Sequence, residues 1–185
     1  MHVPVGGRYP LGYMNNRAKP DAALAQEIVA FRDSFRSMVM ATVNNAADPE
    51  SSYAPFVVNE QNEIFVFVSA LARHTRNLIE QGRASLMFIE DESQAANVFA
   101  RRRLVYQCQS EPVARDTDEW RQAMALFDAR FGQFMETLKA LPDFQLLRLV
   151  PLKGSYVTGF GKAYQLEGVS LNGITHLGPD QLKTD

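Results

Sequence analysis

Residues 53–69 have the sequence YAPFVVNEQNEIFVFVS, in which two apolar runs are separated by the four polar residues EQNE at 60–63. Both runs are rich in the β-branched and aromatic residues that favour strands, and so short a polar gap is typical of a hairpin. A third strand-like run, residues 38–43, precedes them across the polar segment NNAADPESS. Three successive strands without an intervening helix predict an antiparallel meander rather than an alternating α/β chain.

Helices are expected on both sides of this meander. Apolar residues recur at three- and four-residue spacing over residues 19–35, and a second, short helix is expected over 71–81. A longer helix, capped by Asp116 or Thr117, is expected to continue to residue 138. Further strands are expected over residues 84–89, 104–109, 143–150 and 155–161. We therefore predict an α+β fold, an antiparallel β-barrel with peripheral helices.

The composition limits the classes of function. The 185 residues are 46% hydrophobic and carry a net charge of −2, so the whole chain has no general attraction for nucleic acid. The single cysteine, Cys108, excludes an intrachain disulfide. No apolar run approaches the roughly 20 residues of a membrane helix, and the N-terminus lacks the pattern of a signal peptide. We expect a cytoplasmic protein with no membrane partner.

Three histidines, His2, His74 and His176, are the natural candidates for metal or acid–base chemistry. No HExxH, HxxxH or CxxC spacing accompanies them, which argues against a closed zinc site. A haem iron needs only one axial imidazole, so a lone histidine is compatible with it. For His176 the alternative is an exposed side chain on a docked C-terminal tail.

Positive charge gathers where a strand is expected to pass into a helix. Arg73, His74, Arg76 and Arg83 surround this transition, and a helix start with arginines can hold an anion. The alternative is a solvated basic helix start. Arg101, Arg102 and Arg103 form a second basic run, in which strand alternation would point one of the side chains inward.

Several segments, taken in order, resemble a known family. They are SSYAPFV, ALARHTRNLIEQGRASLMFIEDE, FARRRL, RFG, PDFQLLRL, GFGKAYQL and THL. Together they resemble the haem-utilisation proteins of the HutZ/HugZ type, within the pyridoxamine-5'-phosphate-oxidase-like, FMN-binding split-barrel superfamily. Residues 1–18, rich in Gly, Pro, Asn and Tyr, are expected to form an irregular N-terminal arm outside the resemblance. The resemblance implies a split-barrel domain (19–167) and a C-terminal loop (168–185) that carries the haem ligand.

The resemblance also implies a function and a site. The expected protein is a homodimer of split β-barrels that binds haem near the subunit interface and degrades it with oxygen and a reductant. His176 corresponds to the axial iron ligand, and Asp143 to an aspartate that hydrogen-bonds that ligand from the partner subunit. Such a carboxylate would fix the imidazole tautomer and strengthen the ligand. Arg103 and His74 correspond to two further functional positions.

Two alternatives share this fold, because a split barrel supports several chemistries. One is an FMN-dependent oxidoreductase, with the flavin phosphate held near Arg73 and Arg83. Against it, flavin-binding relatives carry an Arg-Lys pair where this chain has Arg73-His74, and a mostly neutral imidazole removes a charge from the phosphate site. The other is a haem carrier or storage protein, in which His176 binds the iron without turnover.

Overall fold

The computed structural model describes residues 22–167 and 173–177, so the predicted N-terminal arm, residues 1–18, lies outside the described residues. The helices are α1 (Ala22–Asp33), α2 (Arg73–Gln81), α3 (Asp118–Phe131) and α4 (Phe134–Lys139), with the 3-10 turns η1 (Glu92–Gln94) and η2 (Val98–Ala100). The strands are β1 (Ser37–Val43), β2 (Pro49–Pro55), β3 (Val57–Val58), β4 (Ile64–Ser69), β5 (Arg83–Ile89), β6 (Arg103–Val113), β7 (Phe144–Gly159), β8 (Lys162–Glu167) and β9 (Gly173–His176).

The strands of the described chain form one antiparallel sheet in the order β2-β1-β5-β6-β7-β4-β3, with β8 added to β7 and β9 added to β8. The two ends of this order, β2 and β3, are consecutive in the chain and are joined by the fully buried Phe56. This connection makes the sheet curl until its edges approach each other. The prediction of an α+β, antiparallel barrel is therefore confirmed.

Strand β4 is buried on both faces, which explains why its sequence is a continuous apolar run instead of an alternating one. Ile64 and Val66 face the barrel interior, where they join the larger buried cluster. Phe65 and Phe67 face the opposite way, into a second cluster that α3 closes with Phe127. A strand buried on both faces requires apolar residues at every position.

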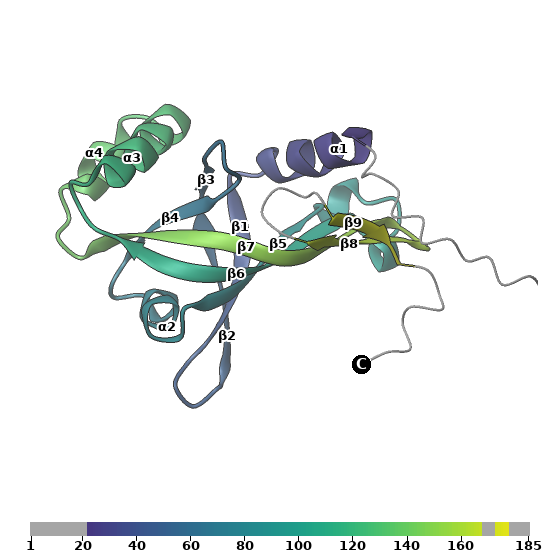
Figure 1. The fold of residues 1–185 in the computed structure, drawn as a ribbon, viewed down its shortest axis with the longest axis horizontal. Helices are drawn as coiled ribbons and strands as arrows, with labels where there is room; N and C mark the ends of the chain where they lie inside the picture. Colours follow the sequence, from purple (N-terminus) through teal and green to yellow (C-terminus); the bar gives the residue numbers. More distant parts are fainter. Residues whose placement is uncertain (1–21, 168–172, 178–185) are drawn as a thin grey trace, which may run out of the picture.

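The long strands β6 and β7 connect two ends of the molecule (Figure 1). Helices α3 and α4 lie at the end where β7 begins, whereas α1, β8 and β9 lie at the end where it finishes (Figure 1). The two strands predicted over 143–150 and 155–161 are this one strand, with a register shift opposite Gln107 and Cys108. Part of the predicted C-terminal loop, residues 173–176, forms strand β9, whose Ile174 packs against the core.

Glycines end two of the helices. Gly82, at φ 64°, ends α2, and Gly132, at φ 72°, ends α3. The prediction of one helix continuing to residue 138 is therefore wrong, because Gly132 separates α3 from α4. Thr117 caps α3 as expected, accepting a hydrogen bond of 3.2 Å from the backbone N–H of Trp120. Among the described helices, each is too short or too polar to cross a membrane.

Candidate functional site

The turn between β4 and α2 brings together four residues, Ser69, Arg73, His74 and Asp143, which we call the α2 corner. Asp143 directly precedes β7, and its backbone carbonyl accepts a hydrogen bond of 2.8 Å from Ala70 N–H. Its carboxylate Oδ2 accepts a second hydrogen bond, of 2.5 Å, from the Ser69 hydroxyl. These contacts fix Asp143 against the end of β4, and within the described part of the chain its second carboxylate oxygen accepts no hydrogen bond.

Arg73 and His74 begin helix α2 and differ in exposure. The Arg73 side chain is 84% exposed, and its Nη1 lies 3.1 Å from Oε1 of Glu50. His74 is half-buried, and its Nε2 is a buried atom without a hydrogen-bond partner among the described residues. Burial lowers the pKa of His74 below the ordinary value of 6.5, and the negative charge of Glu50 opposes this shift in part. His74 is thus biased toward the neutral imidazole.

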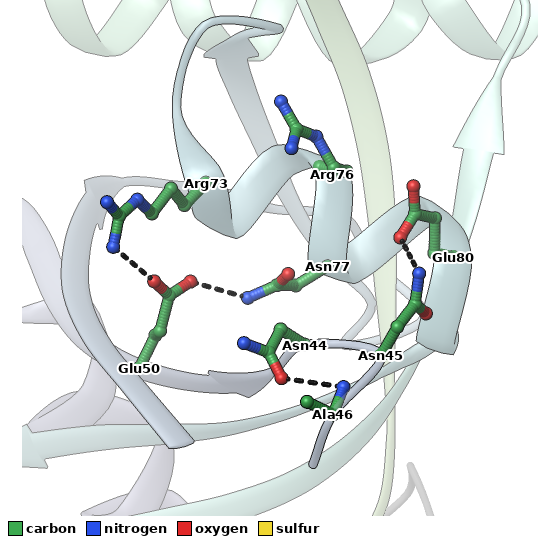
Figure 2. A pocket seen from close by; sticks show the side chains of 8 residues that line it. All are labelled: Asn44, Asn45, Ala46, Glu50, Arg73, Arg76, Asn77 and Glu80. Carbon is green, nitrogen blue, oxygen red and sulfur yellow. Dashed lines mark hydrogen bonds and ion pairs between the residues drawn. The ribbon is translucent and has the colours of Figure 1, made fainter. Parts of the chain in front are cut away.

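Glu50 and Arg73 together line two hollows beside the start of α2. The first, of about 360 Å³, lies between the β1–β2 connection and α2, and Figure 2 shows its residues Asn44, Asn45, Ala46, Glu50, Arg73, Arg76, Asn77 and Glu80. The second, of about 350 Å³, is lined by Glu50, Ser51, Ser52, Arg73 and His74. Apart from Ala46, the residues that line them carry charged, amide, hydroxyl or imidazole groups.

His176 lies at the other end of the molecule, as the last residue of β9. Its cross-strand partner is Tyr164, and the two rings meet edge to face with centroids 5.3 Å apart. Tyr164 pairs in turn with the fully buried Tyr156, so all three side chains lie on the core side of the sheet. Within the described residues, neither ring nitrogen of the exposed His176 has a hydrogen-bond partner. Its imidazole is therefore oriented by packing and available to a ligand.

Arg103 begins β6 on the opposite face of the sheet from His176. It pairs with Val157, which pairs with Ala163, and this row alternates with the row that carries His176. The arginine that points toward the core is Arg102, whose guanidinium lies 4.4 Å from the centroid of the Phe31 ring. The predicted inward arginine of the run 101–103 is thus Arg102.

Arg83 follows the last turn of α2 and is separated from Arg73 by the whole length of that helix. It borders a third hollow, of about 520 Å³, on the outer face of the sheet together with Lys153 and Leu152. The expected pairing of Arg73 and Arg83 around one phosphate is therefore not formed, because the two side chains line different hollows.

Asp143 directly precedes β7, whereas His176 ends β9, the strand that lies beside the far end of β7 (Figure 1). Thirteen residues of extended strand separate Asp143 from Tyr156, the residue level with His176, which is on the order of 40 Å. The two side chains therefore cannot contact each other within one chain. The structure divides the predicted residues into the α2 corner at one end and His176 with Arg103 at the other.

Sequence reasoning missed Glu50, which we interpreted only as part of a polar turn. Its side chain contacts Arg73 and Asn77, which lie 23 and 27 positions further along the chain. Such a contact depends on how the β1–β2 hairpin packs against α2, and no local pattern reveals it. Tyr164, the ring beside His176, was likewise missed, because β9 was not expected as a strand.

Comparison with known proteins agrees with this architecture. Residues 24–158 match the family model described as pyridoxamine 5'-phosphate oxidase. The chain is 43% identical over 154 residues to the heme oxygenase HutZ of Vibrio cholerae serotype O1, covering 83% of this chain and 87% of that protein.

Two solved structures extend the similarity. The crystal structure of the Vibrio cholerae heme storage protein HutZ has 42% identity and a TM-score of 0.65, covering 68% of this chain and 88% of HutZ. That of Campylobacter jejuni ChuZ has 30% identity and a TM-score of 0.78, covering 91% of this chain and 68% of ChuZ. The resemblance inferred from the sequence is confirmed, and the chain belongs to the pyridoxamine 5'-phosphate oxidase family.

Proposed function

We propose that the protein binds haem between the subunits of a homodimer and degrades it oxidatively in the cytoplasm. Haem is the substrate, and its iron supplies the oxygen chemistry when it is bound. The observation that carries the proposal is the exposed imidazole of His176, which is backed by Tyr164 and unpaired within the described residues. A relative of 43% identity named as a heme oxygenase supports the same chemistry.

His176 is the proposed iron ligand. An axial ligand must present a neutral ring nitrogen to the metal, and the edge-to-face contact with Tyr164 limits the rotation of the imidazole. Because β9 is held by β8 and by the packing of Ile174, the ligand stands on a strand instead of a free tail. This anchoring supports a defined position for the iron.

Asp143 is the proposed hydrogen-bond acceptor for the second ring nitrogen of that ligand. Since the two residues are on the order of 40 Å apart along β7, we propose that Asp143 acts on His176 of the partner subunit. A carboxylate there would fix the tautomer and make the imidazole a stronger donor to iron. Ser69 holds the carboxylate in place through its 2.5 Å hydrogen bond.

The outer face of the sheet supports dimerisation. Tyr53, Val39, Met87 and Val105 are directly paired across four neighbouring strands, so they form one apolar row on the face opposite the core. Tyr53 is 71% exposed and Val39 38% exposed in the single chain. A second copy of the chain would cover this row, as expected for an isologous dimer.

The remaining basic residues are proposed to assist haem binding. Arg103 lies on the same outer face as Val105, so it would face the partner subunit and the haem carboxylates. Arg83 and Lys153 border an apolar hollow on that face, where an apolar ring with acidic substituents can lie. Arg73 and His74 are proposed to approach the ligand from the α2 corner.

Haem storage without turnover is the second candidate. It uses the same binding residues, and one structural relative is described as a heme storage protein. The α2 corner favours degradation, because Asp143 acting on the iron ligand would change the reactivity of the haem iron more than the affinity for haem.

The experiment is a titration of the apo-protein with hemin, followed by absorbance. We expect a saturable Soret shift near one haem per subunit that His176→Ala abolishes. The matched control is Thr175→Ala, which changes the exposed neighbour in β9 and should bind normally. Adding a reductant in air should then bleach the Soret band. An unchanged spectrum in His176→Ala would refute the ligand, and a stable band under reductant and air would favour storage.

A further inference from the structure

Glu50, the second residue of β2, places a carboxylate beside the start of α2 (Figure 2). Its Oε1 lies 3.1 Å from Arg73 Nη1, and its Oε2 accepts a hydrogen bond of 2.8 Å from Asn77 Nδ2. Asn77 is buried and also donates 3.0 Å to Thr42 Oγ1, so its amide is fixed by the barrel. The Glu50 carboxylate is therefore held by the fixed Asn77 amide as well as by the long, exposed side chain of Arg73.

Helix α2 provides no negative charge of its own near its first turn. Its nine residues begin without an acidic residue in that turn and without a side-chain cap. Helix N-termini carry free N–H donors and the positive end of the helix dipole, which favour an anion. Glu50, from a strand distant in sequence, supplies that anion.

The Glu50–Arg73 pair also forms a shared wall between the two hollows at the α2 start. The second hollow adds the residues Ser51, Ser52 and His74, whose side chains carry groups that can donate to phosphate oxygens. A phosphate entering it would have to compete with Glu50 for Arg73 and would meet a like charge. The second hollow thus has donors for a phosphate, but the positive charge of its Arg73 is already neutralised by the Glu50 carboxylate.

We propose that Glu50 is an internal counter-anion that closes the start of α2 to phosphate-bearing ligands, so that this chain excludes flavin mononucleotide. The flavin expected from the fold family does not fit the corner as it stands, and Glu50 is the specificity-determining residue. This inference does not depend on whether haem binds, because it concerns the contacts of Glu50, Arg73 and Asn77 alone.

The test is a fluorescence-quenching titration of the apo-protein with flavin mononucleotide, and in parallel with riboflavin, which lacks the phosphate. Glu50→Gln removes the charge and keeps the size of the side chain, with one of the two acceptor oxygens exchanged for an NH2 donor. We expect it to bind flavin mononucleotide at least tenfold more tightly than the wild type, with riboflavin binding unchanged. Adding Arg73→Ala to this variant should abolish the gain.

Glu80→Gln is the matched control, because Glu80 is an α2 carboxylate that lines the first hollow and accepts a hydrogen bond from Asn45 at the far end of the helix. It should leave flavin binding at the wild-type level. Glu50→Ala serves as a second variant, and circular dichroism checks that each protein is folded. The proposal is overturned if the wild type binds flavin mononucleotide as tightly as Glu50→Gln, if riboflavin shares the gain, or if both folded Glu50 variants show none.

Discussion

The Ser69 hydroxyl donates a 2.5 Å hydrogen bond to the carboxylate of Asp143, tying the last residue of β4 to the residue before β7. A second hydrogen bond, from Ala70 N–H to the Asp143 carbonyl, strengthens the same junction. The carboxylate proposed to act on the haem ligand is thus positioned by the barrel itself. Because the barrel holds the backbone of Asp143, changing its side chain should alter haem degradation more than the fold.

Asp143→Asn should weaken haem degradation more than haem binding. The amide retains an acceptor for the Ser69 hydroxyl but removes the negative charge that strengthens the imidazole ligand. We expect the rate of Soret bleaching to fall by at least about tenfold, whereas the haem dissociation constant changes by less than about threefold. Both are measured by absorbance on the same samples. Equal turnover in the variant and the wild type would contradict the role assigned to Asp143.

Gly154→Ala should destabilise the fold, because Gly154 of β7 pairs with Tyr106 of β6 and has no room for a Cβ atom. A Cβ atom there would meet the carbonyl oxygen of Val105 and would lie 2.8 Å from Cδ1 of Tyr106. Overpacking of this kind typically costs about 1–3 kcal/mol in the free energy of unfolding. Chemical denaturation should detect the loss, and Ser155→Ala, one residue along on the outer face, should cost much less. An unchanged midpoint in Gly154→Ala would show that the strands can separate freely.

The local elements were largely predictable from the sequence, because they depend on short-range patterns. The apolar run of β4, the cap at Thr117 and the helix over 71–81 all follow from residues that are neighbours in the chain. Strand β9 was missed, because its short sequence carries only one strongly apolar residue, Ile174, and gains stability from pairing with β8.

The site was predictable only as a set of residue types. Family resemblance indicated His176, Asp143 and Arg103, but their separation within one chain depends on the length of β7 and on strand register. Register also decides that Arg102, and not Arg103, turns toward the core. Glu50 escaped prediction because its contact with Arg73 forms only after the hairpin and α2 have packed together.

Acid should destabilise the fold in part through His74. Burial lowers its pKa below 6.5, so in acid the unfolded chain takes up a proton more readily than the folded one. The free energy of unfolding should therefore fall as the pH falls below 6.5, until the folded histidine is itself protonated. The melting temperature of His74→Asn, followed from about pH 7.5 to pH 5, should decline less than that of the wild type.

Thr175→Ala is the control for this pH series, because it leaves all three histidines in place. Its melting temperature should follow the wild-type decline. Glu50→Gln should steepen the decline, since the charge that favours protonated His74 is lost. Parallel curves for His74→Asn and the wild type would mean that His74 does not contribute to acid sensitivity.

Mixing two impaired variants should restore haem degradation if each site combines Asp143 of one subunit with His176 of the other. A heterodimer of Asp143→Asn and His176→Ala subunits has one site with both native residues and one site with neither. Random exchange of subunits in a two-fold dimer makes half of the dimers mixed, so about one quarter of all sites become intact. The bleaching rate should rise above that of either variant alone, to about that fraction of the wild-type rate. A rate that stays at the level of the separate variants after verified exchange would place the two residues in separate functions, because the length of β7 forbids their contact within one chain.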